Sequence, residues 1–310
     1  MRKNSHSGPV DERHIRCPTN EQLVINGDFF EILSKAKLLV FKEIWSFSGG
    51  KIVKQTKNST VMQAQIPWNK PKNGEKKVKG DETALFYIKK HDQHLSLWQK
   101  LFSVIKSNSF KSEGIKEFDN YCKFRKKGLE TVIPVAAGMK FSSFRHVESF
   151  LITKDFSPFV DLEELVLNRP DTLSGKKNRT KKRNILKAIA RYARRMHDSG
   201  LNQKDFNATH VLLLNLDAKE PQTSLFDLQR VDKNVCNRFK WPIKALAELN
   251  YTLPDHLFTE DDRRYLFQKY LRKNSFNLLN RLQWAWIQKK AARIARHSEK
   301  RGLAPKMSDS

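Results

Sequence analysis

The chain has 310 residues, of which 39% are apolar and 10% aromatic, so it is long and apolar enough to fold around a core and is not a disordered chain. Its 59 Lys and Arg residues exceed its 33 Asp and Glu residues by 26, which is typical of proteins that bind nucleic acid, an anionic membrane surface or phosphorylated substrates. Three widely separated cysteines exclude a disulfide framework, and no run of about 18 apolar residues is present to cross a membrane. These features predict a cytoplasmic protein, with peripheral membrane attachment as an option.

Short apolar runs separated by turn residues predict strands in the first part of the chain. Residues 1–30 begin with a polar stretch that contains Pro9, and they are predicted to form a mobile arm. The runs at 38–47, 52–53, 61–66 and 85–88 are predicted strands, and the lysine-rich segment 68–81 is a predicted exposed loop. Gly49-Gly50 is expected to form a hairpin turn, with a turn that covers a phosphate group as the alternative.

Helical spacing of apolar residues predicts helices at 95–105, 113–127 and 184–199, the last of them ended by Gly200, and a short helix at 162–167. Further strands are predicted at 132–137, 147–153, 211–214 and 224–228. The basic segment 174–180 is predicted to be a loop, and the chain from Trp241 onward is predicted to be helical. This order predicts an α+β fold with two lobes, a small antiparallel-sheet lobe at 31–154 and a mainly helical lobe at 155–310.

Two acids and a histidine are spaced as phosphoryl transfer requires. Asp205 follows the end of the helix at 184–199, His210 comes five residues later, and Asp227 comes at the end of the last predicted strand. The reaction needs one carboxylate to orient the acceptor hydroxyl and a second to hold the magnesium ion that bridges the phosphates of ATP. Protein kinases space these groups similarly, within H-R-D-x-x-x-x-N and then D-F-G.

A lysine and a glutamate earlier in the chain extend this set. Lys89 ends the apolar strand Phe86-Tyr-Ile-Lys89, as in the V-A-I-K strand of kinases, and Glu117 lies on a following helix, where its carboxylate would fix the lysine. Each residue also has a plainer explanation: the lysine and glutamate as solvated charges, the aspartates as caps, and the histidine as a core or surface residue. Five roles in the right order favour the catalytic interpretation.

The sequence resembles the lipopolysaccharide core kinases, the WaaP and Kdo-kinase family. The resemblance is carried by GLNQKDFNATHVLLL at 200–214 and SLFDLQR at 224–230, and it extends over roughly residues 37–303 with insertions. Val40-Phe-Lys-Glu43 is similar to the family's first strand, and residues 113–138 to its glutamate helix and the strand that follows. A histidine at position 210, in place of the asparagine of protein kinases, is typical of this family.

This resemblance implies a protein-kinase-like fold that transfers the γ-phosphate of ATP to a heptose or Kdo hydroxyl of the lipopolysaccharide inner core, at the cytoplasmic face of the inner membrane. It implies Asp205 as the catalytic base, Asp227 as a Mg²⁺ ligand, and His210 as a second ligand or a phosphate contact. Lys89 and Glu117 are implied to be the pair that anchors the phosphates of ATP.

Gln203-Lys204 departs from the family's pattern, which has His-Arg at these positions. The arginine usually holds the catalytic loop, and a lysine lacks its planar guanidinium group. Lys204 is therefore a candidate catalytic residue whose contribution differs from that of arginine. Gln229 also replaces the histidine of D-L-H-R, and both departures bear on the substrate more than on the fold.

Basic residues are concentrated in two segments. Residues 176–195 include ten Lys or Arg and no acid, and residues 289–301 carry six on a predicted amphipathic helix. One interpretation is a packed helix with a solvated face, and the other is docking on an anionic membrane or on lipopolysaccharide phosphates. An acidic protein such as acyl carrier protein also fits this charge. Nucleic acid is not favoured, because no zinc-ligand spacing, RRM signature or clear helix-turn-helix is found.

Two other functions stay open from the sequence. A kinase of the same fold would act on another glycan, a small molecule or a protein. A kinase-like module without activity would bind an anionic membrane or nucleic acid through its basic face, an idea that the Gln203-Lys204 departure keeps open. The presence of Asp205, Asp227, Lys89 and Glu117 argues for an enzyme.

Overall fold

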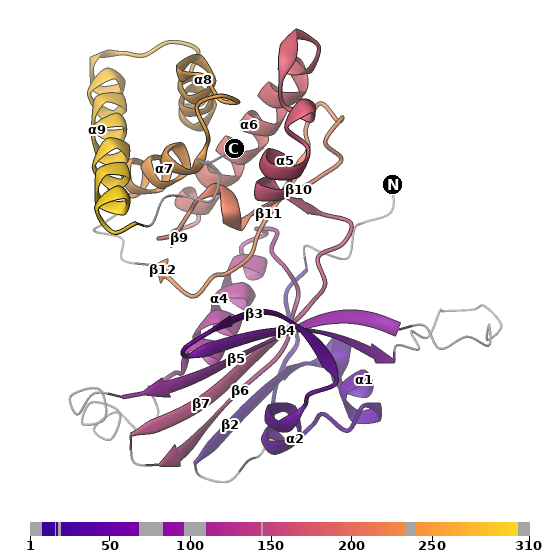
Figure 1. Ribbon diagram of the computed structural model, residues 1–310. Coiled ribbons are helices and arrows are strands. Elements are labelled where there is room, and N and C mark those ends of the chain that lie inside the picture. Colours follow the sequence, from indigo (N-terminus) through magenta and orange to yellow (C-terminus); the bar gives the residue numbers. More distant parts are fainter. Residues whose placement is uncertain are drawn as a thin grey trace, which may run out of the picture. The chain divides into compact units, whose positions relative to one another are not determined.

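The computed structural model describes residues 8–15, 17, 20–67, 83–95, 110–143, 145–233 and 240–302. The chain divides into two compact units, one formed by Met1–Gly128 with Val132–Asp155, the other by Leu129–Thr131 with Phe156–Ser310. The first unit is built on a large antiparallel sheet and the second is mostly helical (Figure 1), which confirms the predicted α+β fold class.

The first unit contains a seven-stranded antiparallel sheet with the order β1-β2-β6-β7-β5-β4-β3. The predicted strands at 52–53, 61–66, 85–88, 132–137 and 147–153 are confirmed, each within a strand that is longer than predicted or shifted by a few residues. The strands are β1 (Glu12–Ile15), β2 (Glu21–Asn26), β3 (Gly50–Thr56), β4 (Ser59–Pro67), β5 (Thr83–His94), β6 (Pro134–Ser143) and β7 (His146–Lys154).

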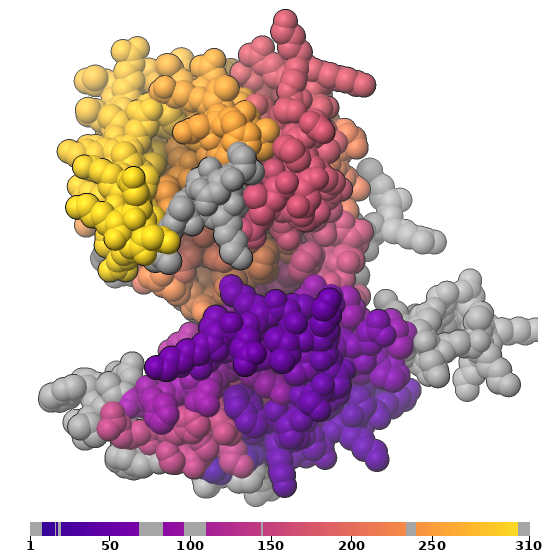
Figure 2. Space-filling view, in the orientation of Figure 1, coloured from indigo at the N-terminus to yellow at the C-terminus, as the bar shows by residue number. Residues whose placement is uncertain are grey.

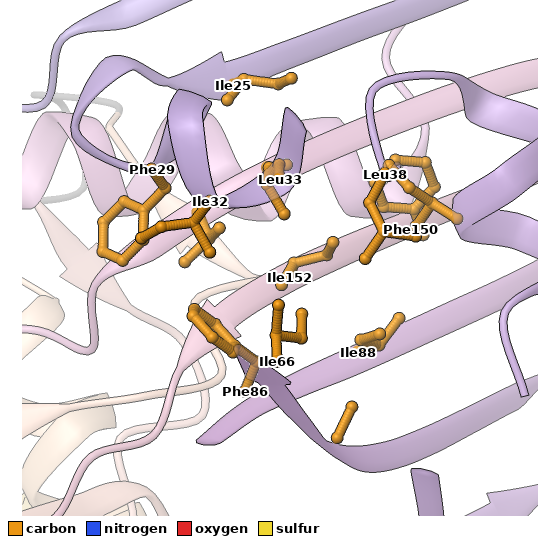
Figure 3. Packing of buried hydrophobic residues seen from close by; sticks show 14 of the residues in the cluster. Ile25, Phe29, Ile32, Leu33, Leu38, Ile66, Phe86, Ile88, Phe150 and Ile152 are labelled. Carbon is orange, nitrogen blue, oxygen red and sulfur yellow. The ribbon is translucent and has the colours of Figure 1, made fainter. Parts of the chain in front are cut away.

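Three short helices, η1 (Gly27–Phe29), α1 (Phe30–Lys35) and α2 (Phe41–Ser46), lie on one face of this sheet (Figure 1). Because successive strand residues point to opposite faces, Phe86 and Ile88 of β5 share this face and are fully buried. Figure 3 shows Leu33 of α1 over Ile152 of β7, and Leu38 beside Phe150. Burial of this apolar cluster provides the main stabilisation of the unit.

Helix α4 (Glu113–Lys126) packs on β6 and β7 from the other face of the sheet (Figure 1). The side chain of Ser112 caps its first turn by accepting a hydrogen bond from the backbone N–H of Ile115. Gly114 permits the close approach, because a Cβ at this position would lie 2.3 Å from the carbonyl oxygen of Phe150. The helix predicted at 113–127 is thus confirmed, and its contact with the sheet places Glu117 against β5.

Two predictions for the start of the chain are wrong. Strands β1 and β2 pair over 12–15 and 21–26, and Leu23 and Ile25 are buried in the core, so these residues are no mobile arm. The run at 38–47 is not a strand, since 41–46 form α2, whose Phe41 and Ile44 are one turn apart and both buried. Strand β2 and helix α2 are both six residues long, which is too short for the spacing of apolar residues to separate a strand from a helix.

A lysine of β5 stabilises the end of α2. Lys90 Nζ donates to the carbonyl oxygens of Trp45 at 2.6 Å and Phe47 at 2.8 Å, and burial lowers the pKa of Lys90.

Gly49-Gly50 links α2 to β3 and is no hairpin turn, since the β3–β4 hairpin turns at Lys57 and Asn58. The predicted loop at 68–81 and all but the first residue of the predicted helix at 95–105 lie outside the described residues.

The second unit consists of helices and two small sheets. Helix α6 contacts α8, and α7 contacts α9. Strand β10 pairs with β11 and with β8, and β12 pairs with β9. The elements are β8 (Val160–Asp161), α5 (Leu162–Asn168), η2 (Pro170–Thr172), α6 (Gly175–Asp198), β9 (Asn202–Gln203), η3 (Ala208–His210), β10 (Val211–Leu214), β11 (Gln222–Leu225), β12 (Val231–Asp232), α7 (Trp241–Thr252), α8 (Glu260–Leu271) and α9 (Leu278–Lys300).

Helix α6 ends where the sequence predicted. Gly200 has φ +84, its N–H bonds to the carbonyl of His197, and the N–H of Leu201 bonds to the carbonyl of Met196, which is a Schellman motif. The start at Gly175 differs from the prediction, because the basic segment 174–180 is helical almost throughout instead of a loop. Acids from other segments offset the clustered positive charge along this helix, in the pairs Lys181–Asp217, Lys182–Asp262 and Lys187–Glu220.

Candidate active site

The first part of the candidate site is an ion pair across the sheet and helix of the first unit. Lys89 lies on β5, on the face opposite to Ile88 and Lys90, and its Nζ is 3.1 Å from Glu117 Oε2 on α4. Only 2% of the Glu117 side chain is exposed, and its Oε1 accepts a second hydrogen bond from the hydroxyl of Tyr121 at 3.0 Å. The predicted contact between Lys89 and Glu117 is therefore present. The ammonium group stays partly exposed, with 20% of the Lys89 side chain accessible.

The second part is the segment from β9 to β12 in the second unit, which carries Asp205 and Asp227. Strands β9 and β12 hold its two ends together, and the N–H of Lys204 donates to the carbonyl of Arg230 at 2.8 Å. The side chain of Gln203 is fully buried and donates to the carbonyls of Phe226 and Asp227, at 3.3 and 2.9 Å. These bonds fix Asp227 in the left-handed conformation with φ 56, which is strained for a residue other than glycine.

Asp205 is held by an arginine that the sequence did not single out. Arg230 NH1 donates to Asp205 Oδ1 at 2.7 Å, and 35% of the Asp205 side chain remains exposed. The carboxylate is therefore oriented on one side and open to solvent on the other. A signal for this contact was available in the sequence, since Arg230 stands three residues after Asp227 in the matched segment.

His210 connects the two acids. Its Nδ1 lies 2.9 Å from the backbone carbonyl oxygen of Asp205, and because a carbonyl only accepts, Nδ1 carries the proton. In the neutral ring Nε2 then has a free electron pair, and it lies 3.8 Å from Asp227 Oδ2. Two bonds of about 2.1 Å to one cation can span this separation. The three residues predicted as one set are thus brought together.

The side chain of Lys204 does not hold the loop in the structure. Its side chain is exposed, and within the described part of the chain no hydrogen bond or ion pair from its ammonium group is present. The loop is held instead by the main chain of Lys204 and by the Gln203 amide. In this chain, therefore, the buried Gln203 amide holds the loop and the exposed Lys204 ammonium group does not.

A further carboxylate lies near Asp205, on α7. Burial raises the pKa of Glu248, and the negative charge of Asp205 raises it further. The same helix supports the loop directly, since Thr252 Oγ1 accepts a hydrogen bond from the N–H of Ala208 at 3.0 Å. Glu248 could not be identified from the sequence, because its proximity to Asp205 arises from the packing of α7 against η3 and β9.

A buried histidine fixes the start of the Asp205 segment. His197, in the last turn of α6, lies 3.0 Å from Asn202 Oδ1 through Nε2 and 2.8 Å from the Tyr270 hydroxyl through Nδ1. The amide oxygen only accepts, so Nε2 is protonated and the neutral ring satisfies both bonds. Burial lowers the pKa of His197 to about 4 from its ordinary value of 6.5.

His197 is expected to lower the free energy of unfolding as the pH is lowered. Between about pH 6.5 and pH 4 the unfolded chain takes up a proton that folded His197 does not, so the free energy of unfolding falls by about 1.4 kcal/mol per pH unit. Urea unfolding across this range should show that His197→Gln removes this contribution and flattens the profile. His297→Gln, at an exposed position of α9, should leave the profile unchanged. Equal slopes for wild type and His197→Gln would contradict the assignment.

Comparison with known proteins supports one family. The model of the lipopolysaccharide kinase (Kdo/WaaP) family matches residues 75–270, which include both parts of the candidate site. The chain is 26% identical over 192 residues to the lipopolysaccharide core heptose(I) kinase WaaP of Pseudomonas aeruginosa, covering 60% of this chain and 70% of that protein. It is 28% identical over 187 residues to the protein of the same name from Escherichia coli K12, covering 57% and 67%.

The fold also has a counterpart among solved structures. A structure of WaaP in complex with acyl carrier protein superposes with a TM-score of 0.60 at 21% identity, covering 88% of this chain and 98% of that chain. A likeness at this identity concerns the fold, and it agrees with the fold predicted from the sequence.

Proposed function

Since the chain belongs to the lipopolysaccharide kinase (Kdo/WaaP) family of phosphotransferases, we propose that it transfers the γ-phosphate of ATP to a hydroxyl of a lipopolysaccharide inner-core sugar, a heptose or Kdo. The observation that carries this proposal is the connected set of Asp205, His210 and Asp227, within the range that the family model matches. Phosphoryl transfer depends mainly on positioning and on charge neutralisation, and both require such a fixed polar set.

Asp205 is the proposed catalytic base. Its carboxylate orients the acceptor hydroxyl and takes its proton as the oxygen attacks the γ-phosphorus. The role is supported by its partial exposure and by Arg230, which holds Oδ1 and leaves the other oxygen for the substrate. We assign to Lys204 a contact with anionic groups of the acceptor, because its ammonium group is exposed next to Asp205 in the chain.

Asp227 and His210 would hold Mg²⁺, which supplies neutralisation of the phosphate charge when it is bound. The residues fit this ion: one carboxylate oxygen provides the ligand type that Mg²⁺ prefers, and Nε2 of His210, the ring nitrogen that does not contact the Asp205 carbonyl, faces it. Because Mg²⁺ binds imidazole less readily than oxygen, Asp227 is the principal ligand and His210 a second ligand or a phosphate contact. Lys89, oriented by buried Glu117, would donate to phosphate oxygens of ATP.

The acceptor sugar can be identified with truncated lipopolysaccharides. We propose to offer γ-labelled ATP with dephosphorylated inner core that ends at Kdo, and separately with core that also carries the first heptose. Label on both acceptors would assign Kdo, and label on the second alone would assign heptose. Label on neither, but on another glycan, a small molecule or a protein, would exclude the core-sugar proposal and keep the kinase activity.

We also propose that the protein attaches to the anionic surface of the inner membrane through α9. In the described part of the chain no helix is long and apolar enough to span a bilayer. Trp284 and Ile287 of α9 are buried, whereas Leu278, Leu282 and Trp286 on the opposite side are 75, 49 and 48% exposed. At helical spacing this exposed stripe continues into a basic half, formed by Lys289, Arg293, Arg296 and Lys300.

Figure 2 shows α9, in yellow, along the surface of its unit. An apolar stripe that continues into cations suits a bilayer interface with anionic headgroups, to which each cation contributes about 1 kcal/mol. The double variant Leu282→Ser/Trp286→Ser is expected to bind vesicles of anionic phospholipid about tenfold more weakly or worse. Ile52→Ser/Val53→Ser, at exposed apolar positions of β3, is the matched control. Equal vesicle binding by both double variants in a sedimentation assay would exclude α9 as the attachment surface.

An acidic protein such as acyl carrier protein is a proposed second partner. The support is the complex in which WaaP was solved and the charge at the start of α6. Lys176, Lys177 and Arg179 are exposed there, and within the described residues none of them forms an ion pair. A complex that forms at low salt and dissociates as salt rises would agree with this charge.

A further inference from the structure

Three potential metal ligands meet at one end of the sheet in the first unit, apart from the residues proposed for catalysis. Asp92 and His94 are the third-last and last residues of β5, and His146 is the first residue of β7. In the antiparallel register His94 lies directly opposite His146, and Asp92 lies two residues along β5 on the same face. The pairing of the strands thus brings together residues that are 52 positions apart in the chain.

The ligand atoms of these three side chains all lie within 4.8 Å of one another. The His94 and His146 rings are stacked, with centroids 4.7 Å apart, and His146 Nε2 contacts the Asp92 carboxylate. The other ring nitrogen of His146, Nδ1, is 2.5 Å from the Ser142 hydroxyl, so the ring is held from both sides. Metal-binding histidines are usually oriented in this way by a hydrogen bond at the second nitrogen.

We propose that Asp92, His94 and His146 bind one divalent transition-metal ion, with Zn²⁺ as the best match. Two imidazoles and one carboxylate form a common three-ligand Zn²⁺ set, in which water takes the fourth position. Mg²⁺ and Ca²⁺ favour sites made only of oxygen, so the two histidines select against them. On binding, the metal takes the place of the proton between His146 Nε2 and the Asp92 carboxylate, and the ring keeps its single proton on Nδ1, which then donates to the Ser142 hydroxyl.

A metal ion bound at this site would cross-link β5 and β7. Both strands are long, and β5 also carries Lys89 five residues before His94. Because residues an odd number of positions apart point to opposite faces, the metal site and Lys89 lie on different faces of the sheet. The site is therefore independent of the proposed phosphoryl transfer, and metal binding should raise the melting temperature of the protein without being needed for ATP use.

The test is calorimetric titration of ZnCl₂ into full-length protein that carries no histidine tag and has been treated with a chelator. We expect one saturable site and no competition from excess MgCl₂, because the two imidazoles favour Zn²⁺ over Mg²⁺. His94→Ala and His146→Ala should each abolish this site. Ser142→Ala should weaken it about tenfold, because Ser142 only orients the His146 ring.

His14→Ala is the matched control, since His14 is another exposed strand histidine of the same sheet. It should leave the stoichiometry and affinity for Zn²⁺ unchanged. Substitution with Co²⁺ provides a second readout, as the visible absorption of a four-coordinate site should appear in wild type and be lost in His146→Ala. The absence of a saturable site in wild type, or a site that survives both histidine substitutions, would overturn the proposal.

Discussion

Replacement of Asp205 by asparagine is expected to lower the turnover number for phosphate transfer by on the order of 10²–10⁴-fold, the usual contribution of general-base catalysis. The amide has the shape of the carboxylate and can still accept a hydrogen bond from Arg230. The Asp205 backbone carbonyl that fixes His210 is also unchanged. The variant should therefore fold, bind MgATP as wild type does, and lack only the group that accepts the proton of the sugar hydroxyl.

The matched control for this variant is Asp217→Asn. The Asp217 side chain is 89% exposed and pairs with Lys181 on α6, so its loss should affect neither turnover nor nucleotide affinity. Initial rates with γ-labelled ATP and calorimetric titration with MgATP measure the two quantities separately. Near-wild-type turnover by folded Asp205→Asn protein would show that another group is the base, and Glu248 would be the next candidate.

Replacement of Lys89 by methionine is expected to lower kcat/KM for ATP about 100-fold or more, through weaker binding of the phosphates and their poorer alignment. The substitution keeps an unbranched side chain of similar, slightly shorter length and removes the charge that Glu117 orients. It also removes the Lys89 ammonium group from the buried Glu117 carboxylate, which costs stability. The double variant Lys89→Met/Glu117→Leu removes both charges and keeps the test decisive if the single variant unfolds.

The neighbouring lysine provides the control. Lys90→Met removes a charge of the same kind from the same strand, but from the face that packs on α2. It should lower the melting temperature, because the carbonyls of Trp45 and Phe47 lose their donor, while KM for ATP stays at the wild-type value. If both lysine variants had wild-type kcat/KM, Lys89 would be excluded from the ATP site. If both lost ATP use equally, the effect would be one of folding.

The parts of the site that the sequence predicted are those whose partners follow from local spacing. The spacing of apolar residues predicted β5 as a strand and α4 as a helix, and in the structure these two elements place Lys89 beside Glu117. Asp205, His210 and Asp227 are separated by short stretches of sequence, so their proximity in space was also predictable. The catalytic and metal-binding roles of these residues stay predictions that the variants above test.

The features that the sequence did not reveal depend on contacts between distant segments. Helix α6 begins nine residues earlier than predicted, because Asp217, Glu220 and Asp262 offset the positive charge of its lysines. Glu248 lies near Asp205 only through the packing of α7. The metal ligands Asp92, His94 and His146 show no spacing that points to a site, since the register of β5 and β7 alone brings them together.

The most direct test of the proposed function is phosphate transfer from γ-labelled ATP, in the presence of Mg²⁺, to dephosphorylated inner-core lipopolysaccharide. The proposal predicts that wild-type protein places the label on a core sugar in a stable phosphomonoester, at a rate that depends on Asp205. If folded wild-type protein binds MgATP and leaves every core acceptor unlabelled, the core-sugar kinase function is contradicted.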